Sequence, residues 1–120
     1  MTTENLHETA LKWFAAFNHH DLETLLALYD DNAVHYSPKL KIRSPATNGL
    51  IKGKPALREW WKDSFSRLPS LQYEIIRLTP SEDHVFMEYV RHVEGEEDLQ
   101  VGEMLEVKNG LINVSRVYHS

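Results

Sequence analysis

Apolar residues repeat at helical spacing near the N-terminus: Leu6, Ala10, Trp13 and Phe17. This spacing predicts a helix over residues 4–18 that buries one stripe. A second stripe predicts a helix over 22–29, with Asp21 as its N-cap. A third helix is expected over 55–68, because Pro at its first turn sacrifices no hydrogen bond. The first half of the chain is therefore mainly helical.

After Pro69 the pattern changes to the alternation typical of β-strands. Four strands are predicted, over 71–78, 85–93, 99–107 and 111–119. Between the helices we expect a turn at 30–32, a short strand at 33–36, and a loop at 38–54 that holds a brief strand at Leu50–Ile51. Helices followed by an antiparallel meander indicate the α+β class, with helices packed on one face of a curved sheet.

Two charged residues fall on the apolar faces of these strands. Alternation places Arg91 and Glu103 among aliphatic and aromatic neighbours. A carboxylate in such surroundings must be paired, face a cavity or be protonated. We expect Arg91 on the adjacent strand to be its partner. The pair is either a structural ion pair or part of a ligand pocket.

The turn near Asn109–Gly110 decides what else lies beside Glu103. A two-residue turn sets Glu103 opposite Arg116. A three-residue turn sets it opposite Ser115 and brings His119 onto the same face. The first choice gives the cleaner apolar face, and the sequence leaves both open.

The chain has 120 residues, a net charge of −5 and no cysteine, which suits one domain without disulfides. Its N-terminus lacks the pattern of a secretory signal, and no apolar run is long enough for a membrane span. We therefore expect a cytoplasmic protein that binds neither membranes nor nucleic acid.

The charge is unevenly distributed. Residues 38–54 carry five cations and no acid, whereas Glu94, Glu96, Glu97 and Asp98 form an acidic cluster. The basic segment is either a solvated surface or a positive rim that attracts an anionic ligand.

Several kinds of chemistry lack their sequence patterns. The seven histidines show no HxH or HxxxH spacing, so no metal site is predicted. Phosphate-binding glycine loops and nucleophile elbows are absent as well. We expect no cofactor.

Three stretches carry a resemblance to a known family: WFAAFNHHDLETLLALYDDNAVHYSP (13–38), GKPALREWW (53–61) and VGEMLEVKNGLINVSRVY (101–118). They resemble the nuclear transport factor 2-like superfamily, in its SnoaL-like and ketosteroid-isomerase-like branch. The resemblance implies a cone-shaped α+β fold in which three N-terminal helices pack on a curved antiparallel or mixed sheet. It implies one SnoaL-like domain over 1–120.

The ketosteroid isomerases use three catalytic groups, and the resemblance maps them onto this chain. The oxyanion-hole tyrosine falls at Trp13, and the general-base aspartate falls at Ser37. The second oxyanion acid, a carboxyl group kept protonated, falls at Glu103. Only the last position keeps its role, so ketosteroid isomerisation by the family's mechanism is not expected. His35 or Tyr36 is an alternative proton-transfer group, but adjacent strand residues point to opposite faces and at most one can reach the pocket.

The predicted site combines these two lines of reasoning. The catalytic candidates are Glu103, His119 and Arg91. The predicted pocket lining is Trp13, Phe17, Tyr29, Ser37, Trp60, Met87, Tyr89, Ser115 and Val117. The aromatic members also fit an ordinary core. The resemblance implies that the long loop 38–54 lies at the mouth of the cone.

Two functions fit equally well. One is acid/base catalysis by an isomerase, cyclase or hydrolase on a hydrophobic carbonyl-bearing or anionic substrate. The other is a protein that binds or senses such a ligand without chemistry. A third possibility is a protein-interaction module that uses the outer sheet face. Members of the fold commonly dimerise through that face, so we expect a homodimer with Phe86, Glu88, Val90 and His92 at its interface.

Overall fold

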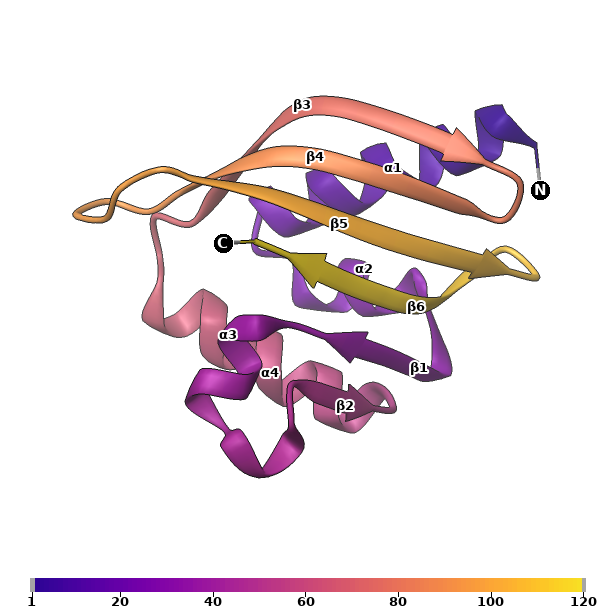
Figure 1. Ribbon diagram of the computed structural model, residues 1–120. Coiled ribbons are helices and arrows are strands. Elements are labelled where there is room, and N and C mark those ends of the chain that lie inside the picture. The colour runs from indigo at the N-terminus through magenta and orange to yellow at the C-terminus, as the bar shows by residue number, and fades with distance from the viewer. Residues whose placement is uncertain (1, 120) are drawn as a thin grey trace.

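The computed structural model describes residues 2–119 and contains one six-stranded sheet with helices against it (Figure 1). The helical elements are α1 (Thr3–Asn18), α2 (Leu22–Ala27), α3 (Pro38–Arg43), the 3₁₀ turn η1 (Pro45–Thr47) and α4 (Lys54–Arg67). The strands are β1 (Tyr29–Tyr36), β2 (Leu50–Lys52), β3 (Gln72–Ser81), β4 (His84–His92), β5 (Leu99–Lys108) and β6 (Leu111–Tyr118). This confirms the predicted α+β class.

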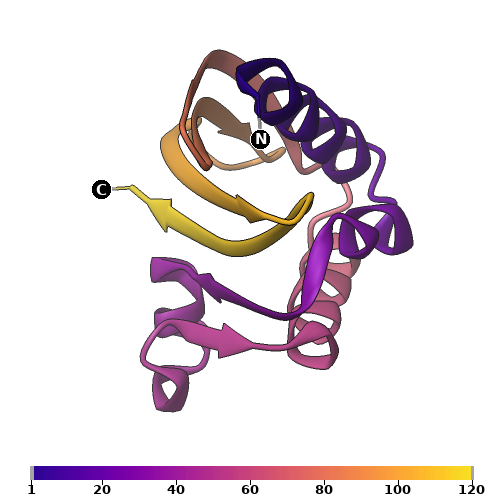
Figure 2. The same ribbon diagram turned by 90° about the vertical axis from the view of Figure 1, so that its right-hand side faces the viewer.

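The sheet has the order β2-β1-β6-β5-β4-β3. All neighbouring pairs are antiparallel except β1 and β6, which run parallel. Figure 2 shows that the sheet is strongly curved, with α1, α2 and α4 on one side of it. The long antiparallel strands and the helices therefore enclose the core between them.

Side-chain caps start the first two helices, and the cap of the second is the predicted Asp21. The Thr2 side chain accepts a hydrogen bond from the Asn5 amide at 3.1 Å, and Asp21 does the same for Thr24 at 3.1 Å. The second helix ends at Ala27 rather than at 29, which corrects the prediction. Tyr29 belongs to β1 instead, because it pairs with Ile112 of β6, and sheet pairing outweighs the local helical pattern.

The segment 38–54 is more ordered than the predicted loop. Ser37 caps α3, accepting a hydrogen bond from the Lys39 amide at 3.3 Å, and Pro38 occupies the first turn of this helix. Pro38 therefore begins a helix rather than a loop. The brief strand at Leu50–Ile51 was predicted, and it pairs with β1 as β2.

The register of the last hairpin matches neither predicted option. The turn has two residues, since Lys108 pairs with Leu111, but the pairing shifts by one residue between Val107 and Glu106. This bulge sets Glu103 opposite Val117. It leaves Ser115 fully buried on the inner side of the sheet, which is the face that the three-residue option predicted.

Candidate functional site

A cavity of about 260 Å³ lies between the helices and the inner face of the sheet. Its walls are largely aromatic, formed by Trp13, Phe17, Trp60, Trp61, Tyr73 and Tyr89. Its buried polar groups are His35, Ser37, Ser64 and Glu103. Its charged, solvent-facing edge, which we call the mouth, consists of Lys39, Arg43, Arg67, Arg91 and Glu96. A mostly apolar space with a few polar groups is typical of small-molecule sites.

Four aromatic rings form a continuous wall from α1 to the sheet. Phe17 stacks on Tyr73 with ring centroids 4.2 Å apart and planes 14° apart. Tyr73 lies 4.2 Å from Tyr89, and Trp13 stacks on Phe17 at 5.1 Å. Such a wall presents flat apolar area that suits a flat hydrophobic ligand.

Most of the predicted site residues line this cavity. Those that do are Glu103, His119, Arg91, Trp13, Phe17, Ser37, Trp60, Tyr89 and Val117. The other three predicted lining residues, Tyr29, Met87 and Ser115, do not line it. All three are completely buried, because they point into the core behind the cavity wall. Ser115 contacts the ring of His35, which lines the cavity, and Tyr29 contacts Ser115.

Glu103 is the buried acid of the cavity. Only 2% of its surface is exposed, and its Oε1 accepts a hydrogen bond from the Tyr89 hydroxyl at 2.7 Å. Its Oε2 has no hydrogen-bond partner among the described residues. Burial raises the pKa of Glu103 to about 7, and the Tyr89 hydrogen bond opposes this rise. The carboxyl group can therefore both take up and release a proton near neutral pH.

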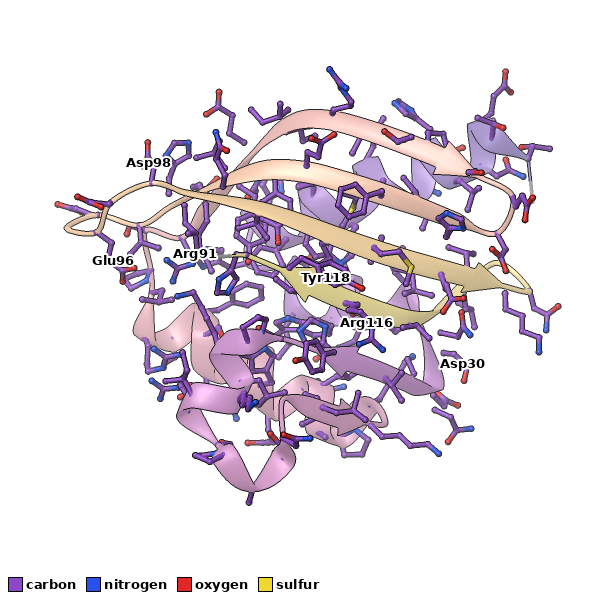
Figure 3. All side chains as sticks on the ribbon, in the orientation of Figure 1. Asp30, Arg91, Glu96, Asp98, Arg116 and Tyr118 are labelled. Carbon is purple, nitrogen blue, oxygen red and sulfur yellow. The ribbon has the colours of Figure 1, made fainter. Side chains whose placement is uncertain are left out.

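Arg91 is not the partner of Glu103, which corrects the predicted ion pair. Its guanidinium lies 2.8 Å from Glu96 in the turn between β4 and β5, as Figure 3 shows at the left end of the sheet. Across the strands, Glu103 is paired with Met87, and Arg91 is paired with Leu99. Arg91 is four positions after Met87 along β4, so the charges of Arg91 and Glu103 lie at different depths.

His35 is a cavity residue that the sequence left undecided. Its ring is buried, whereas its neighbour Tyr36 faces the opposite side of the sheet, where Arg116 lies over its ring at 5.0 Å. Ala33, His35 and Ser37 are buried in alternation with half-buried neighbours, which puts His35 on the inner face of the sheet. Burial lowers the pKa of His35 to about 4, so its ring is neutral at physiological pH.

A chain of buried hydrogen bonds sets the orientation of His35. The Trp13 indole N–H donates to the Tyr29 hydroxyl at 3.1 Å, and Tyr29 donates to the Ser115 hydroxyl at 3.1 Å. Ser115 in turn lies 2.6 Å from Nδ1 of His35. The Tyr29 hydroxyl accepts from the indole, which can only donate, and donates its own hydrogen to Ser115. We infer that Ser115 donates in turn to Nδ1, which assigns the ring proton of His35 to Nε2.

The remaining lining residues were not singled out from the sequence. Trp61 and Tyr73 complete the aromatic wall, and Lys39 and Arg67 belong to the mouth. Helical periodicity marks Trp61 as buried without telling core from cavity. Lys39 belongs to the basic segment 38–54 that was considered as a positive rim, whereas for Arg67 there was no sequence signal beyond its charge.

Ser37, at the position of the missing general base, has a structural role. Its hydroxyl accepts the hydrogen bond that caps α3, and the residue is 5% exposed. A neutral serine hydroxyl is no base, so Ser37 does not replace the missing aspartate.

Comparison with known proteins agrees with this architecture. The sequence profile of the SnoaL-like domain matches residues 10–114. The chain belongs to the SnoaL-like family. This places it in the nuclear transport factor 2-like superfamily that the sequence resembled. Among curated proteins none matches the chain.

Solved structures share the fold at low sequence identity. A SnoaL-like protein of unknown function from Burkholderia thailandensis has a TM-score of 0.86 at 22% identity, covering 100% of this chain and 98% of that one. A candidate ketosteroid isomerase from Kribbella flavida has a TM-score of 0.81 at 21% identity, covering 98% and 79%. A candidate polyketide cyclase from Sinorhizobium meliloti has a TM-score of 0.80 at 15% identity, covering 98% and 100%. At these identities the likeness establishes the fold, and the site must be argued from its own residues.

Residues 2–119 contain no group of three or more His, Asp or Glu side chains placed to hold a metal ion. No helix within them is long and apolar enough to cross a membrane.

Proposed function

We propose that the cavity binds a hydrophobic, carbonyl-bearing small molecule and that Glu103 moves a proton on it. The observation that carries this proposal is the state of Glu103. It is a buried carboxyl group lining the cavity, held at one oxygen by Tyr89 and without a partner at the other, with a pKa of about 7. A general acid/base works best when its pKa lies near the working pH.

The proposed step uses two groups of the cavity. The Glu103 carboxylate takes a proton from the carbon beside the carbonyl, and the C–H electron pair forms the double bond of an enolate. The enolate oxygen accepts a hydrogen bond from Nε2–H of neutral His35. When Glu103 returns the proton to another carbon of the same skeleton, an isomerisation is complete and the carboxylate is restored.

A neutral histidine suits this task. Its low pKa keeps the ring neutral, and the N–H of a neutral imidazole is a very weak acid, so it stabilises the developing negative charge as a hydrogen-bond donor without losing its proton. In this chain the hydrogen-bond chain from Trp13 supplies the tautomer that such a donor needs. His119 also lines the cavity and stays a prediction as a second proton-transfer group.

The test measures proton exchange directly. The bicyclic ketone 2-tetralone is incubated with the protein in D₂O, and deuterium uptake beside the carbonyl is followed by NMR. We expect Glu103→Gln to reduce the protein-dependent exchange by roughly 10²- to 10⁴-fold, the usual contribution of a general base. The matched control is Glu106→Gln, which removes a carboxylate from the opposite face of the same strand. Equal exchange by wild type and Glu103→Gln contradicts the proposal.

One observation favours a second function, ligand binding without chemistry. The position of the family's catalytic base holds Ser37, and its hydroxyl is engaged in capping α3. Under this alternative the ketone binds, as seen by a rise in melting temperature, but wild type and Glu103→Gln both leave its exchange at the solvent rate.

We also propose that two copies associate through the outer sheet face. Phe86, Glu88, Val90 and His92 follow one another at every second position of β4, and all are half-buried. The ring of Phe86 lies against Gly102, where an added Cβ would come within 2.6 Å of it. The missing side chain keeps this part of the face flat. Light scattering is expected to give a dimer for wild type and a monomer for Phe86→Asp, and a wild-type monomer contradicts the proposal.

A further inference from the structure

An ion pair occupies the mouth of the cavity. Arg91 lies near the end of β4 with its side chain only 9% exposed, and its Nη1 lies 2.8 Å from Oε1 of Glu96. Glu96 belongs to the turn at residues 93–98, which joins β4 to β5, and its side chain is 47% exposed. Figure 3 shows Arg91 and Glu96 close together at this end of the sheet. Both residues line the same cavity as Glu103.

The mouth carries more positive than negative charge. Besides Arg91 it contains Lys39 from α3, Arg43 from the same helix and Arg67 from α4. Asp63, which does not line this cavity, binds Arg67 at 2.8 Å and Arg43 at 3.6 Å. That leaves Arg91 and Lys39 for Glu96, the one carboxylate that lines the mouth within residues 2–119.

The charges around Glu96 act on one another. The pKa of Glu96 is lowered first by its hydrogen bond to Arg91 and then by attraction to Arg91, Lys39 and Arg67. The pKa of Lys39 is lowered by burial and by the nearby Arg91, while Glu96 opposes this. Two cations therefore converge on one carboxylate at the entrance of an aromatic cavity.

Arg91 binds Glu96 less completely than a guanidinium can bind a carboxylate. A guanidinium has five N–H donors and binds carboxylates best through two parallel hydrogen bonds, whereas a single one joins it to Glu96. Glu96 lies on an exposed turn, and exposed ion pairs contribute little to stability. A ligand carboxylate that approaches Arg91 through two parallel hydrogen bonds would use this guanidinium more fully than Glu96 does.

We propose that the ligand of this cavity carries a carboxylate, which binds Arg91 and Lys39 by displacing Glu96. Glu96 occupies the anion site when the cavity is empty, and it competes with the ligand. The apolar part of the ligand lies against the aromatic wall, and its acid group is held at the mouth. This inference rests on the proposed role of the cavity as a small-molecule site, and it adds the charge of the substrate.

The competition predicts a simple effect on affinity. When only a fraction of the molecules is competent to bind, the apparent Kd equals the intrinsic Kd divided by that fraction. If Glu96 occupies Arg91 in about nine of ten molecules, its removal tightens carboxylate binding about tenfold. A neutral ligand of the same shape gains nothing from the freed arginine.

The experiment measures binding of 4-phenylbutyrate and of its neutral amide, 4-phenylbutanamide. All three tryptophans of the chain line the cavity, so quenching of intrinsic fluorescence reports occupancy. We expect Glu96→Gln to bind the carboxylate about tenfold more tightly than wild type does, with the amide unchanged. Glu97→Gln is the matched control, because it removes the neighbouring charge of the same turn from a residue that does not line the cavity. We expect Arg91→Gln to abolish the preference for carboxylate over amide.

Three results overturn the proposal. The first is that Glu96→Gln and Glu97→Gln change the affinity for the carboxylate equally, and the second is that Glu96→Gln changes the affinities for carboxylate and amide equally. The third is that Glu96→Gln does not bind the carboxylate at all. None of them depends on Glu103. If the wild-type protein prefers the carboxylate but does not catalyse deuterium exchange of the ketone, only the proposed catalysis is contradicted. If it catalyses the exchange but does not prefer the carboxylate, only this inference is contradicted.

Discussion

The two glutamates that line the cavity, Glu103 and Glu96, have opposite surroundings. Glu103 lies in the interior, where removal of water raises its pKa and the Tyr89 hydroxyl donates a hydrogen bond to it. Glu96 lies at the mouth, where Arg91 lowers its pKa and half of its side chain remains in water. The same residue type is therefore prepared for proton transfer in one place and for ion pairing in the other. Burial and partners set the chemistry, not residue identity.

The largest expected effect concerns the pH dependence of stability at Glu103. Folding raises its pKa from 4.5 to about 7, so its contribution to stability is fully present below pH 4.5 and is lost as the pH rises through 7. A shift of this size corresponds to about 3 kcal/mol. We expect Glu103→Gln to gain about 3 kcal/mol relative to wild type between pH 4.5 and pH 8. Urea unfolding at a series of pH values measures this difference, and a constant difference would contradict it.

His35 is expected to show an effect of equal size and opposite sign. Folding lowers its pKa from 6.5 to about 4, so its contribution is present above pH 6.5 and is lost as the pH falls through 4. His35→Gln should therefore gain about 3 kcal/mol relative to wild type on acidification across this range. In wild type the two groups oppose each other, which flattens the stability profile between pH 4.5 and 6.5. The double variant shows whether the slopes belong to these two residues, because it should lack both.

A smaller effect is expected from the hydrogen-bond chain behind His35. Trp13→Phe removes the indole donor and leaves the buried Tyr29 hydroxyl oxygen without it, at a cost of about 1–3 kcal/mol. Trp60→Phe is the matched control, because it shrinks an indole in the same cavity that takes no part in the hydrogen-bond chain from Trp13 to His35. In wild type, ¹⁵N NMR should find the proton of His35 on Nε2. A proton on Nδ1 would contradict the assigned direction of the chain.

The smallest effect is expected at the mouth. Glu96→Gln should change the free energy of unfolding at pH 7 by roughly 0.5 kcal/mol or less, because the pair with Arg91 is partly exposed. Its pH dependence should appear only below the ordinary range of a glutamate, since its pKa is lowered. Thermal unfolding at pH 5 and pH 8 compares it with Glu103→Gln. If the stability of Glu96→Gln relative to wild type changed above pH 5 as much as that of Glu103→Gln, the two glutamates would not have the different surroundings described here.

Much of the fold could be predicted because its patterns are local. The apolar stripe of α1 and the alternation of β4 and β5 require no knowledge of their partners. The same alternation correctly placed Glu103 on the buried face. The prediction failed at Tyr29 because pairing with the distant β6 decides its structure, and it failed at Pro38 because the local cap at Ser37, which starts α3, was not recognised.

The site was less predictable, for the same reason. Arg91 and Glu103 lie on adjacent strands, and both side chains are on the buried face. The register of the strands nevertheless keeps them apart, and Arg91 forms its ion pair with Glu96. His35 could be placed only once β1 was paired with β6, because that pairing brings Ser115 to its ring.

By itself the sequence determined which faces are apolar, that one acid is buried among them, and that positive charge gathers in the segment before α4. Only the tertiary structure decided which groups meet: Glu103 with Tyr89, His35 with Ser115, and Arg91 with Glu96. The physical reason is that burial follows from the periodicity of a single segment, whereas a hydrogen bond depends on the register and curvature of segments far apart in the chain.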